Sequence, residues 1–288
     1  ISALLAAAIL VAYRAWQEET AWQHRLADPA QRAAETRRLG EVGFKPALPL
    51  IKPHLSDADP AVRSATLWAI GQLGGPIDVD AVIPLSQDVD PSVRREAAGS
   101  LGKIYAPSAR DALRLLLADK DESVRLAAVE ALGVADDPGV TQLLLPAVSD
   151  AAPAVRLAAM QNLAAQPGPA TITAMHRLLA SPQADPALRE IAQRLADQPT
   201  DALRAAAREA IVVGESLDTR LAGATFVGRW RDASAVAAMI QLLDLVVAGK
   251  SRLRPNDVRI DPRFRTAMID ALAAIGAPAF DELRKLAI

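Results

Sequence analysis

The chain has 288 residues, of which 51% are hydrophobic, 3% aromatic and 23% charged, and its formal net charge is -2. A core that is poor in aromatic residues and rich in Ala, Leu, Val and Ile favours packed helices over sheets, and the near-neutral charge excludes a global attraction to nucleic acid or to an anionic membrane. The chain has no cysteine, which excludes disulfides, thiolate metal sites and cysteine nucleophiles but leaves the cellular compartment open.

The first element in chain order is the apolar run ISALLAAAILVAY at residues 1–13. It has no polar helical face, and it is shorter than the roughly 20 residues that a bilayer span requires. Because position 1 is isoleucine, we expect a fragment or a processed chain, in which this run is the second half of a membrane span. Tyr13, Arg14 and Trp16 would then lie at the membrane interface. The alternatives are an apolar helix buried against protein and an uncleaved signal-peptide core.

From residue 28 onward, an arginine recurs at nearly constant spacing, and we name these residues the register arginines. They are Arg32, Arg63, Arg94, Arg125, Arg156, Arg189, Arg220 and Arg265. Consecutive register arginines lie 31, 31, 31, 31, 33, 31 and 45 residues apart. A period of about 20–50 residues is typical of solenoids, in which each repeat is one supersecondary unit.

The residues around each register arginine predict a short helix followed by a second one. An Asp-Pro pair usually precedes the arginine, because aspartate caps a helix start and proline suits the first helical position. Alanines follow and let neighbouring helices approach closely. Eight residues after the arginine stands a glycine, which we interpret as the helix terminator. This glycine occurs as Gly40, Gly71, Gly102, Gly133 and Gly228.

The pattern Asp-x-Asp-Pro-x-Val-Arg, followed by alanines and Leu-Gly, appears as DADPAVR, DVDPSVR and DKDESVR. It resembles the HEAT-repeat family, specifically the short subtype named after phycobilisome lyase subunits. The resemblance covers about residues 28–288 and implies an all-α fold, an α-α superhelix that forms a right-handed solenoid of about eight repeats. It further implies that second helices line a concave face suited to partner proteins. The copy around Arg189 lacks the terminal glycine, and the copy around Arg220 lacks the Asp-Pro pair.

We therefore expect two parts in the chain. Residues 1–27 form an apolar N-terminal helix, a partial membrane anchor with a connector, and residues 28–288 form one HEAT-repeat solenoid. The repeated Asp and Arg residues are open to two interpretations: a line of ligand contacts, or a structural ladder between adjacent turns. Because catalysis needs one constellation of residues and not eight copies, we predict the structural ladder.

The sequence predicts neither catalytic residues nor a metal or cofactor. His24, His54 and His176 are far apart and have no acidic neighbours at metal-ligand spacing. A metalloprotease motif, a Gly-rich phosphate loop and a nucleophile elbow are all absent from the sequence.

One irregular step, near residues 246–260, adds about 14 residues to the regular period of 31. Its basic residues, apart from the register arginine, are Lys250, Arg252, Arg254, Arg259 and Arg263. Insertions in repeat proteins map to loops, often on the binding face. We predict that this insertion docks an acidic protein surface, a phosphate or anionic lipid headgroups. The alternative is a solvated loop whose charges only aid solubility.

Taken together, these features predict a non-enzymatic scaffold or adaptor that binds other protein subunits in a larger, membrane-tethered complex. We expect lipid contact through the N-terminal helix and no nucleic-acid partner. The alternative is a lyase-like or maturation-factor subunit that attaches a chromophore or cofactor to a client protein. The expected location is membrane-associated, with the solenoid in the periplasm or, alternatively, in the cytoplasm.

Overall fold

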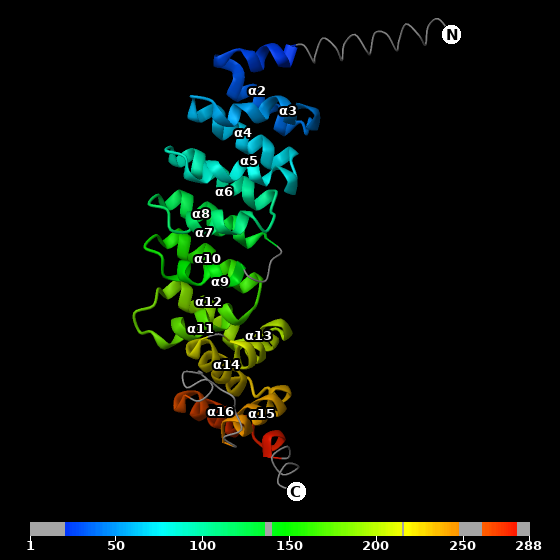
Figure 1. Ribbon diagram of the computed structural model, residues 1–288. Coiled ribbons are helices and arrows are strands. Elements are labelled where there is room, and N and C mark those ends of the chain that lie inside the picture. Colours follow the sequence, from blue (N-terminus) through cyan, green and yellow to red (C-terminus); the bar gives the residue numbers. More distant parts are fainter. Residues whose placement is uncertain (1–20, 136–139, 215, 248–260, 281–288) are drawn as a thin grey trace, which may run out of the picture. The chain divides into compact units, whose positions relative to one another are not determined.

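The computed structural model describes residues 21–135, 140–214, 216–247 and 261–280, and these residues form helices and turns with no strand among them. Their contacts divide the chain into two compact units, Ile1–Ala135 (unit 1) and Asp136–Ile288 (unit 2). Within each unit, first and second helices follow one another along the chain (Figure 1). The all-α class and the helix–turn–helix repeat predicted from the sequence are confirmed.

The first helices of unit 1 are α2 (Pro29–Glu41), α4 (Pro60–Leu73), α6 (Pro91–Lys103) and α8 (Glu122–Gly133). Each begins after an aspartate whose carboxylate accepts a hydrogen bond from the amide two residues on, as Asp59 does from Ala61 at 2.8 Å. The same cap forms where glutamate replaces the proline, since Asp121 accepts from the Ser123 amide at 2.8 Å. α2 packs on α4, α4 on α6, and α6 on α8.

The second helices of unit 1 are shorter, and prolines interrupt two of the three. The first is divided into η1 (Lys45–Ala47), α3 (Leu48–Ile51) and η2 (Lys52–Ser56), and the next into η3 (Pro76–Asp78), α5 (Val79–Val82) and η4 (Ile83–Gln87). Pro49, Pro53 and Pro84 cannot donate the backbone hydrogen bond that a continuous α-helix requires there. α7 (Ala109–Leu116) has no proline and forms one helix.

Four of the five repeat glycines do not terminate their first helices, which corrects the interpretation of Gly40, Gly71, Gly102 and Gly228 as helix ends, whereas Gly133 does end α8 as predicted. Gly40, Gly71, Gly102 and Gly228 lie inside their helices, and Gly133 is the last residue of α8. The glycines that adopt a left-handed φ are instead Gly43 and Gly276, among the residues that the structure describes. A methyl group on Gly102 would lie 2.7 Å from the Cα atom of Ala131 in the next first helix. Gly40, Gly71, Gly102 and Gly228 therefore permit close packing of their helices on the next first helix.

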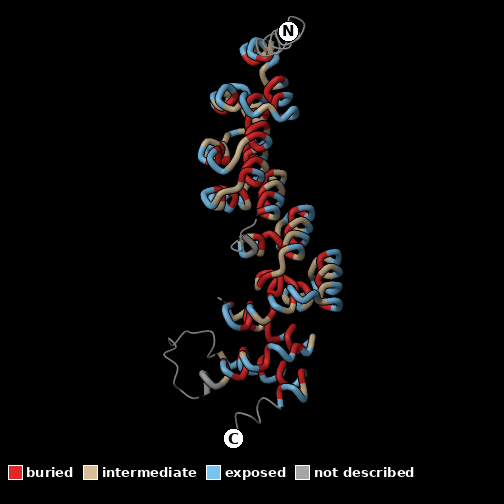
Figure 2. The backbone as a smooth tube through the Cα atoms, turned by 90° about the vertical axis from the view of Figure 1, so that its right-hand side faces the viewer, coloured by how far each residue is buried: buried red, intermediate tan, exposed pale blue. Residues whose placement is uncertain are grey.

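One end of the unit 1 core is covered by residues 21–27, which are helical. Trp22 and Leu26 are buried against Leu39 and Ile51 of the first repeat, and the Trp22 ring meets the Phe44 ring edge-on at 5.7 Å. Figure 2 shows the buried residues of this unit gathered where the helices face one another, with exposed residues at the turns. The segment expected to be a connector thus packs on the first repeat.

Unit 2 continues the alternation, and its second helices after the short α9 and η5 are longer than those of unit 1. Its elements are α9 (Val140–Leu144), η5 (Pro146–Ser149), α10 (Pro153–Ala165), α11 (Pro169–Ala180), α12 (Pro186–Asp197), α13 (Asp201–Val213), α14 (Leu217–Arg229), η6 (Ala233–Ala235), α15 (Val236–Val247) and α16 (Pro262–Ile275). α14 packs on α16, as consecutive first helices do in unit 1, but it also packs extensively on α13.

The α13–α14 contact depends on a second glycine in α14. A methyl group on Gly223 would lie 2.7 Å from the carbonyl oxygen of Ala207 and 3.0 Å from the Cβ atom of Ala210. α13 is a second helix by its order in the sequence, yet it approaches α14 as closely as first helices approach each other. Ser216 caps α14 in place of the missing Asp-Pro pair, and its hydroxyl accepts from the Thr219 amide at 3.1 Å.

The predicted apolar run at residues 1–13, with Tyr13, and the adjacent Arg14 and Trp16 lie outside the described residues. Of the insertion predicted near residues 246–260, only Val246 and Val247 are described, and they end α15. Within the described ranges, no helix has both the length and the apolar character needed to cross a membrane.

Candidate functional site

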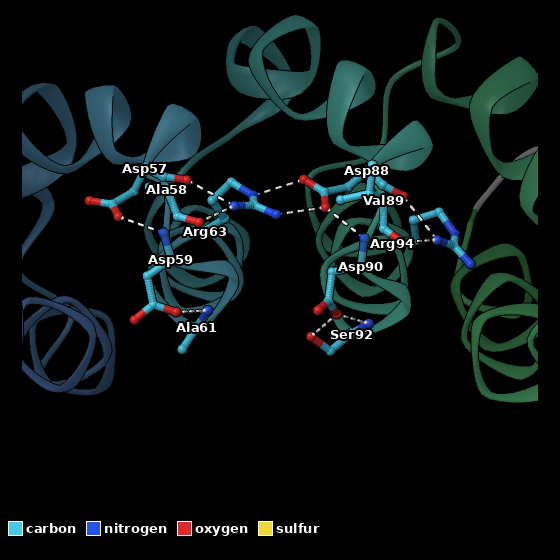
Figure 3. A network of polar contacts seen from close by, with 10 residues as sticks. All are labelled: Asp57, Ala58, Asp59, Ala61, Arg63, Asp88, Val89, Asp90, Ser92 and Arg94. Atoms are coloured by element: carbon cyan, nitrogen blue, oxygen red, sulfur yellow. Dashed lines mark hydrogen bonds and ion pairs between the residues drawn. The ribbon is translucent and has the colours of Figure 1, made fainter.

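Each register arginine of unit 1 contacts the turn that precedes its own helix, and Figure 3 shows this arrangement for Arg63. Its Nη1 donates to the carbonyl oxygens of Asp57 at 2.8 Å and Ala58 at 3.1 Å. Its Nε and Nη2 donate to the two carboxylate oxygens of Asp88, in the turn of the next repeat, at 2.8 Å and 2.7 Å. One guanidinium thus joins two successive turns by four hydrogen bonds.

The same geometry recurs along unit 1. Arg94 Nη1 donates to the Asp88 carbonyl oxygen at 2.9 Å, while its Nε and Nη2 bind the Asp119 carboxylate at 2.7 Å and 2.9 Å. Arg32 Nη1 donates to the Asp57 carboxylate at 2.5 Å. The acidic partner follows its arginine by 25 residues in each case. Arg125 Nη1 likewise donates to the Asp119 carbonyl oxygen, at 2.9 Å.

In unit 2 the ladder changes where the repeat is 33 residues long. Arg156 Nη1 donates to the Asp150 carbonyl oxygen at 3.0 Å, but the position 25 residues on is Ser181. Arg156 Nη2 instead binds Asp185 at 2.5 Å, the aspartate that also caps α12. The register arginine Arg189 donates to the Ser181 carbonyl oxygen. At the longer turn, the bidentate ion pair is therefore replaced by a single hydrogen bond from Arg156 to the Asp185 carboxylate and a hydrogen bond from Arg189 to the Ser181 carbonyl oxygen.

The last two register arginines also differ from the ladder of unit 1. Arg220 is buried, donates to the Ile211 carbonyl oxygen at 2.5 Å, and lies 5.8 Å from the Phe264 ring centroid. Arg265 is exposed on α16. The nearby Arg263 has a side chain 72% exposed and binds Asp261, the capping residue of its own helix, at 2.9 Å.

The ladder carboxylates are held in their ionised form. A hydrogen bond from the Asp59 amide, together with Arg32, lowers the pKa of Asp57. Burial acts to raise the pKa of Asp88, but hydrogen bonds from Arg63 and the Asp90 amide outweigh it and lower that pKa overall. Each of these charges is engaged by the neighbouring turn, which leaves the ladder little capacity to bind a ligand.

A second polar cluster lies at an open depression of about 370 Å³, which is lined by residues of α2, α4 and α6 and which we name the small-residue groove. Its small residues are Ala33, Ala34, Ala61, Ser64, Ala65 and Ser92, and its charged residues are Arg37, Arg95 and Glu96. Next to them, the Arg37 guanidinium lies 4.9 Å and the Lys103 ammonium 5.8 Å from the ring centroid of Trp68.

The charges of this groove are not neutralised by ion pairs. Arg37, Arg95 and Lys103 have no carboxylate within 4.0 Å in the described part of the chain, and Glu96 has no cation at that distance. Burial raises the pKa of Glu96 although the three cations act to lower it. The sequence analysis did not predict this cluster. The signal that could have revealed it is that its charged residues lie at positions other than the repeated Asp and Arg positions of the ladder.

Unit 2 contains a pocket of about 450 Å³ beside the lengthened turn. Leu145, Val148, Leu178 and Leu188 supply much of its apolar lining. Its two arginines are engaged, because Arg156 binds Asp185 and Arg177 binds Asp218, each at 2.5 Å. The polar groups of this pocket therefore serve mainly to join elements of the fold.

The histidines do not assemble into a site. His176 Nδ1 lies 4.0 Å from the Asp218 carboxylate, while His24 and His54 belong to unit 1. Burial lowers the pKa of His54, which favours its neutral form. Within the described ranges, no group of three or more His, Asp or Glu side chains is arranged to hold a metal ion. Lys250, Arg252, Arg254 and Arg259 lie outside those ranges.

Paired helices that repeat every 31 residues, joined by an arginine ladder, define an α-helical repeat protein. The sequence profile of HEAT repeats matches residues 21–88, 79–164 and 113–212, and the chain belongs to the HEAT-repeat family. A search of curated protein sequences finds no match.

Several solved structures are similar to the chain at low identity. Human deoxyhypusine hydroxylase in complex with glycerol is 20% identical, with 92% of this chain and 98% of that chain covered and a TM-score of 0.38. The complex of CpcE and CpcF of phycocyanin lyase from Nostoc is 21% identical, with 78% and 94% covered and a TM-score of 0.41. An engineered protein is 18% identical, with 90% and 80% covered and a TM-score of 0.45.

Proposed function

We propose that the chain is a non-enzymatic scaffold or adaptor that binds other protein subunits. The observation that supports this function is the division of its charges into two sets. The repeated charges are engaged by neighbouring turns, whereas the cations of the small-residue groove are exposed on a helical surface that a macromolecule can reach. HEAT repeats generally mediate contacts between proteins, and extended repeat surfaces suit such partners.

The finer parts of the proposal rest on the sequence. The 31-residue spacing supports assignment to the short phycobilisome-lyase-type subtype. The apolar run at residues 1–13, which ends in Tyr13 and is followed by Arg14 and Trp16, supports a membrane tether, with the repeats in the periplasm or, alternatively, in the cytoplasm. The basic residues Lys250, Arg252 and Arg254 support a second docking element in the insertion.

The proposed function is tested by purifying the tagged full chain, after cross-linking in cells, from both the soluble fraction and detergent-solubilised membranes. We expect one or more protein subunits to co-elute at constant stoichiometry in size-exclusion chromatography with light scattering. Elution as a lone chain from both fractions would contradict the scaffold. Stoichiometric tetrapyrrole absorbance in the purified chain would instead support the lyase-like alternative.

The insertion is tested separately by reversing two of its charges, Arg252→Glu and Arg254→Glu, in the full chain. We expect weaker retention of the partner, because rim charges steer and orient protein association. The matched control is Arg114→Glu with Lys120→Glu, which changes the charge equally at two exposed residues of unit 1. If both double variants retain the partner equally, the insertion is not part of the binding surface.

A further inference from the structure

We propose that the small-residue groove of unit 1 binds an acidic segment of a partner protein, whose carboxylates pair with Arg37, Arg95 and Lys103. This inference rests on the proposed scaffold function and names the chemistry of one partner. Two features that lie next to each other support it. One is a set of exposed cations without ion pairs, and the other is a floor of small side chains on three consecutive first helices.

The floor of the groove admits side chains of a ligand close to the helices. Alanines and serines from α2, α4 and α6 line it, and its volume of about 370 Å³ is at the lower end of the range for bound groups. Ser64 contributes a hydroxyl oxygen that is buried and has no hydrogen-bond partner among the described residues.

The charges around the floor favour an anionic ligand. Three cations surround a single carboxylate. Arg95 is not required by the repeat, since the corresponding positions in the preceding repeats are Ala33 and Ser64. A guanidinium presents paired donors that match a carboxylate, so Arg37 and Arg95 are suited to Asp or Glu side chains. A carboxylate bound there would supply the ion pair that these cations lack among the described residues.

Protein is favoured over nucleic acid as the source of the anions. The Trp68 ring already has the Arg37 and Lys103 cations over it, so it does not offer a free stacking platform for a base. Glu96 lies within the groove and would repel the evenly spaced phosphates of a nucleic acid. A peptide can place its carboxylates to either side of Glu96 and an apolar residue against the alanines.

The test uses the purified full chain and a fluorescein-labelled peptide in which Glu-Leu-Glu-Ala is repeated three times. We expect saturable binding that changes tryptophan fluorescence, weakens with salt, and is lost when glutamine replaces glutamate in the peptide. Arg37→Glu with Arg95→Glu should weaken binding by about tenfold or more, while the control pair Arg114→Glu with Lys120→Glu leaves it unchanged. Glu96→Gln, which removes a like charge, should tighten binding about two- to threefold.

Several results would overturn the inference. Absence of peptide binding, or equal losses in the groove and control pairs, would show that no specific acidic site exists. Stronger binding to a single-stranded DNA oligonucleotide or to phosphatidylglycerol vesicles, with the same dependence on Arg37 and Arg95, would assign the groove to another anion. If Arg37→Glu with Arg95→Glu unfolds the chain, Glu96→Gln still decides, because unchanged or weaker peptide binding contradicts the proposal.

The cross-linked purification separates failure of this inference from failure of the proposed function. If the groove variant and its control retain the same stoichiometric partner, and neither the peptide nor Glu96→Gln behaves as expected, the scaffold stands and the acidic site is wrong. If no partner is retained from cells but the peptide binds as expected, the groove chemistry stands and the scaffold function is wrong.

Discussion

At the level of single residues, the hydrogen bonds of the ladder require arginine at each register position. Arg63 satisfies two carbonyl oxygens of one turn and both carboxylate oxygens of Asp88 in the next, using three nitrogen atoms. The planar guanidinium has enough donors in a fixed fork to do this, whereas a lysine ammonium has three donors on a single nitrogen. The turns of adjacent repeats are thereby held at a set distance from each other.

Loss of a ladder arginine should affect stability rather than partner binding. Arg94→Ala leaves the Asp119 carboxylate, which is 10% exposed, without its two charge-assisted hydrogen bonds. We expect the free energy of unfolding, measured by urea titration, to fall by about 2–4 kcal/mol. Arg114→Ala, at a side chain that is 57% exposed, should change it by less than about 0.5 kcal/mol. Normal stability of Arg94→Ala with loss of the partner would contradict the structural role.

The ladder also predicts how stability depends on pH. The pKa values of Asp57, Asp88 and Asp119 lie below their usual value in the folded chain. Their contribution is therefore fully present above the unfolded pKa of about 4, and it is lost as the pH falls through the lower folded values. We expect urea midpoints to fall steeply below about pH 4. The Asp88→Asn variant should be less stable than the wild type at pH 7 and should lose less unfolding free energy on acidification. If the pH dependence of stability is parallel in the two proteins, Asp88 does not contribute in this way.

At the scale of the elements, glycine sets the distance between first helices. Gly40, Gly71 and Gly102 each face the backbone of the following first helix, where a Cβ atom would lie between 2.7 and 3.1 Å from a Cα atom. Glycine is a weak helix former, so its place inside these helices is explained by packing and not by propensity. In the second helices, proline interrupts the backbone hydrogen bonds and divides the segments into short pieces.

Two glycine-to-alanine substitutions in α6 distinguish the effect of helix–helix packing on stability from the effect of helix propensity. Gly102→Ala would place a methyl group 2.7 Å from the Ala131 Cα atom, and we expect a loss of about 1–3 kcal/mol of unfolding free energy. Gly99→Ala meets nothing within 4 Å and should gain about 0.5–1 kcal/mol from its better helix propensity. Thermal and urea unfolding measure both. Equal gains at the two positions would show that the helices can move apart without cost.

At the scale of the whole molecule, stability in a repeat protein comes from contacts between neighbours, so the end of an array must be covered. In unit 1 the helical residues 21–27 provide this cover, and Trp22 is 5% exposed against the first repeat. The tryptophan therefore serves the repeat core.

Truncation of this cover should destabilise the adjacent repeat first. Trp22→Ala removes the ring that meets Phe44 and is expected to lower the unfolding free energy of unit 1 by about 2–4 kcal/mol. Hydrogen exchange should quicken in α2 before it does in α8. Leu50→Ala, at a residue 48% exposed in α3, is the control and should cost less than about 1 kcal/mol. Equal protection of α2 in the wild type and Trp22→Ala would show that the cover is dispensable.

The sequence by itself determined the period, the all-α class and most helix starts, since the Asp cap and the proline act on amides of their own turn. It also predicted that the register arginines join adjacent turns, although it did not identify Asp88 or Asp119 as the partners. These features follow from local chemistry repeated at a fixed spacing, which a reading along the chain can recognise.

Only the tertiary structure decided the features that depend on contacts between helices that are distant in the sequence. The atoms that crowd Gly102 belong to Ala131, so a glycine that resembles a helix terminator is a packing residue. The close contact between α13 and α14, and the convergence of Arg37, Arg95 and Glu96 over one groove, arise in the same way. The physical reason is that steric fit and unneutralised charge are properties of surfaces brought together by folding.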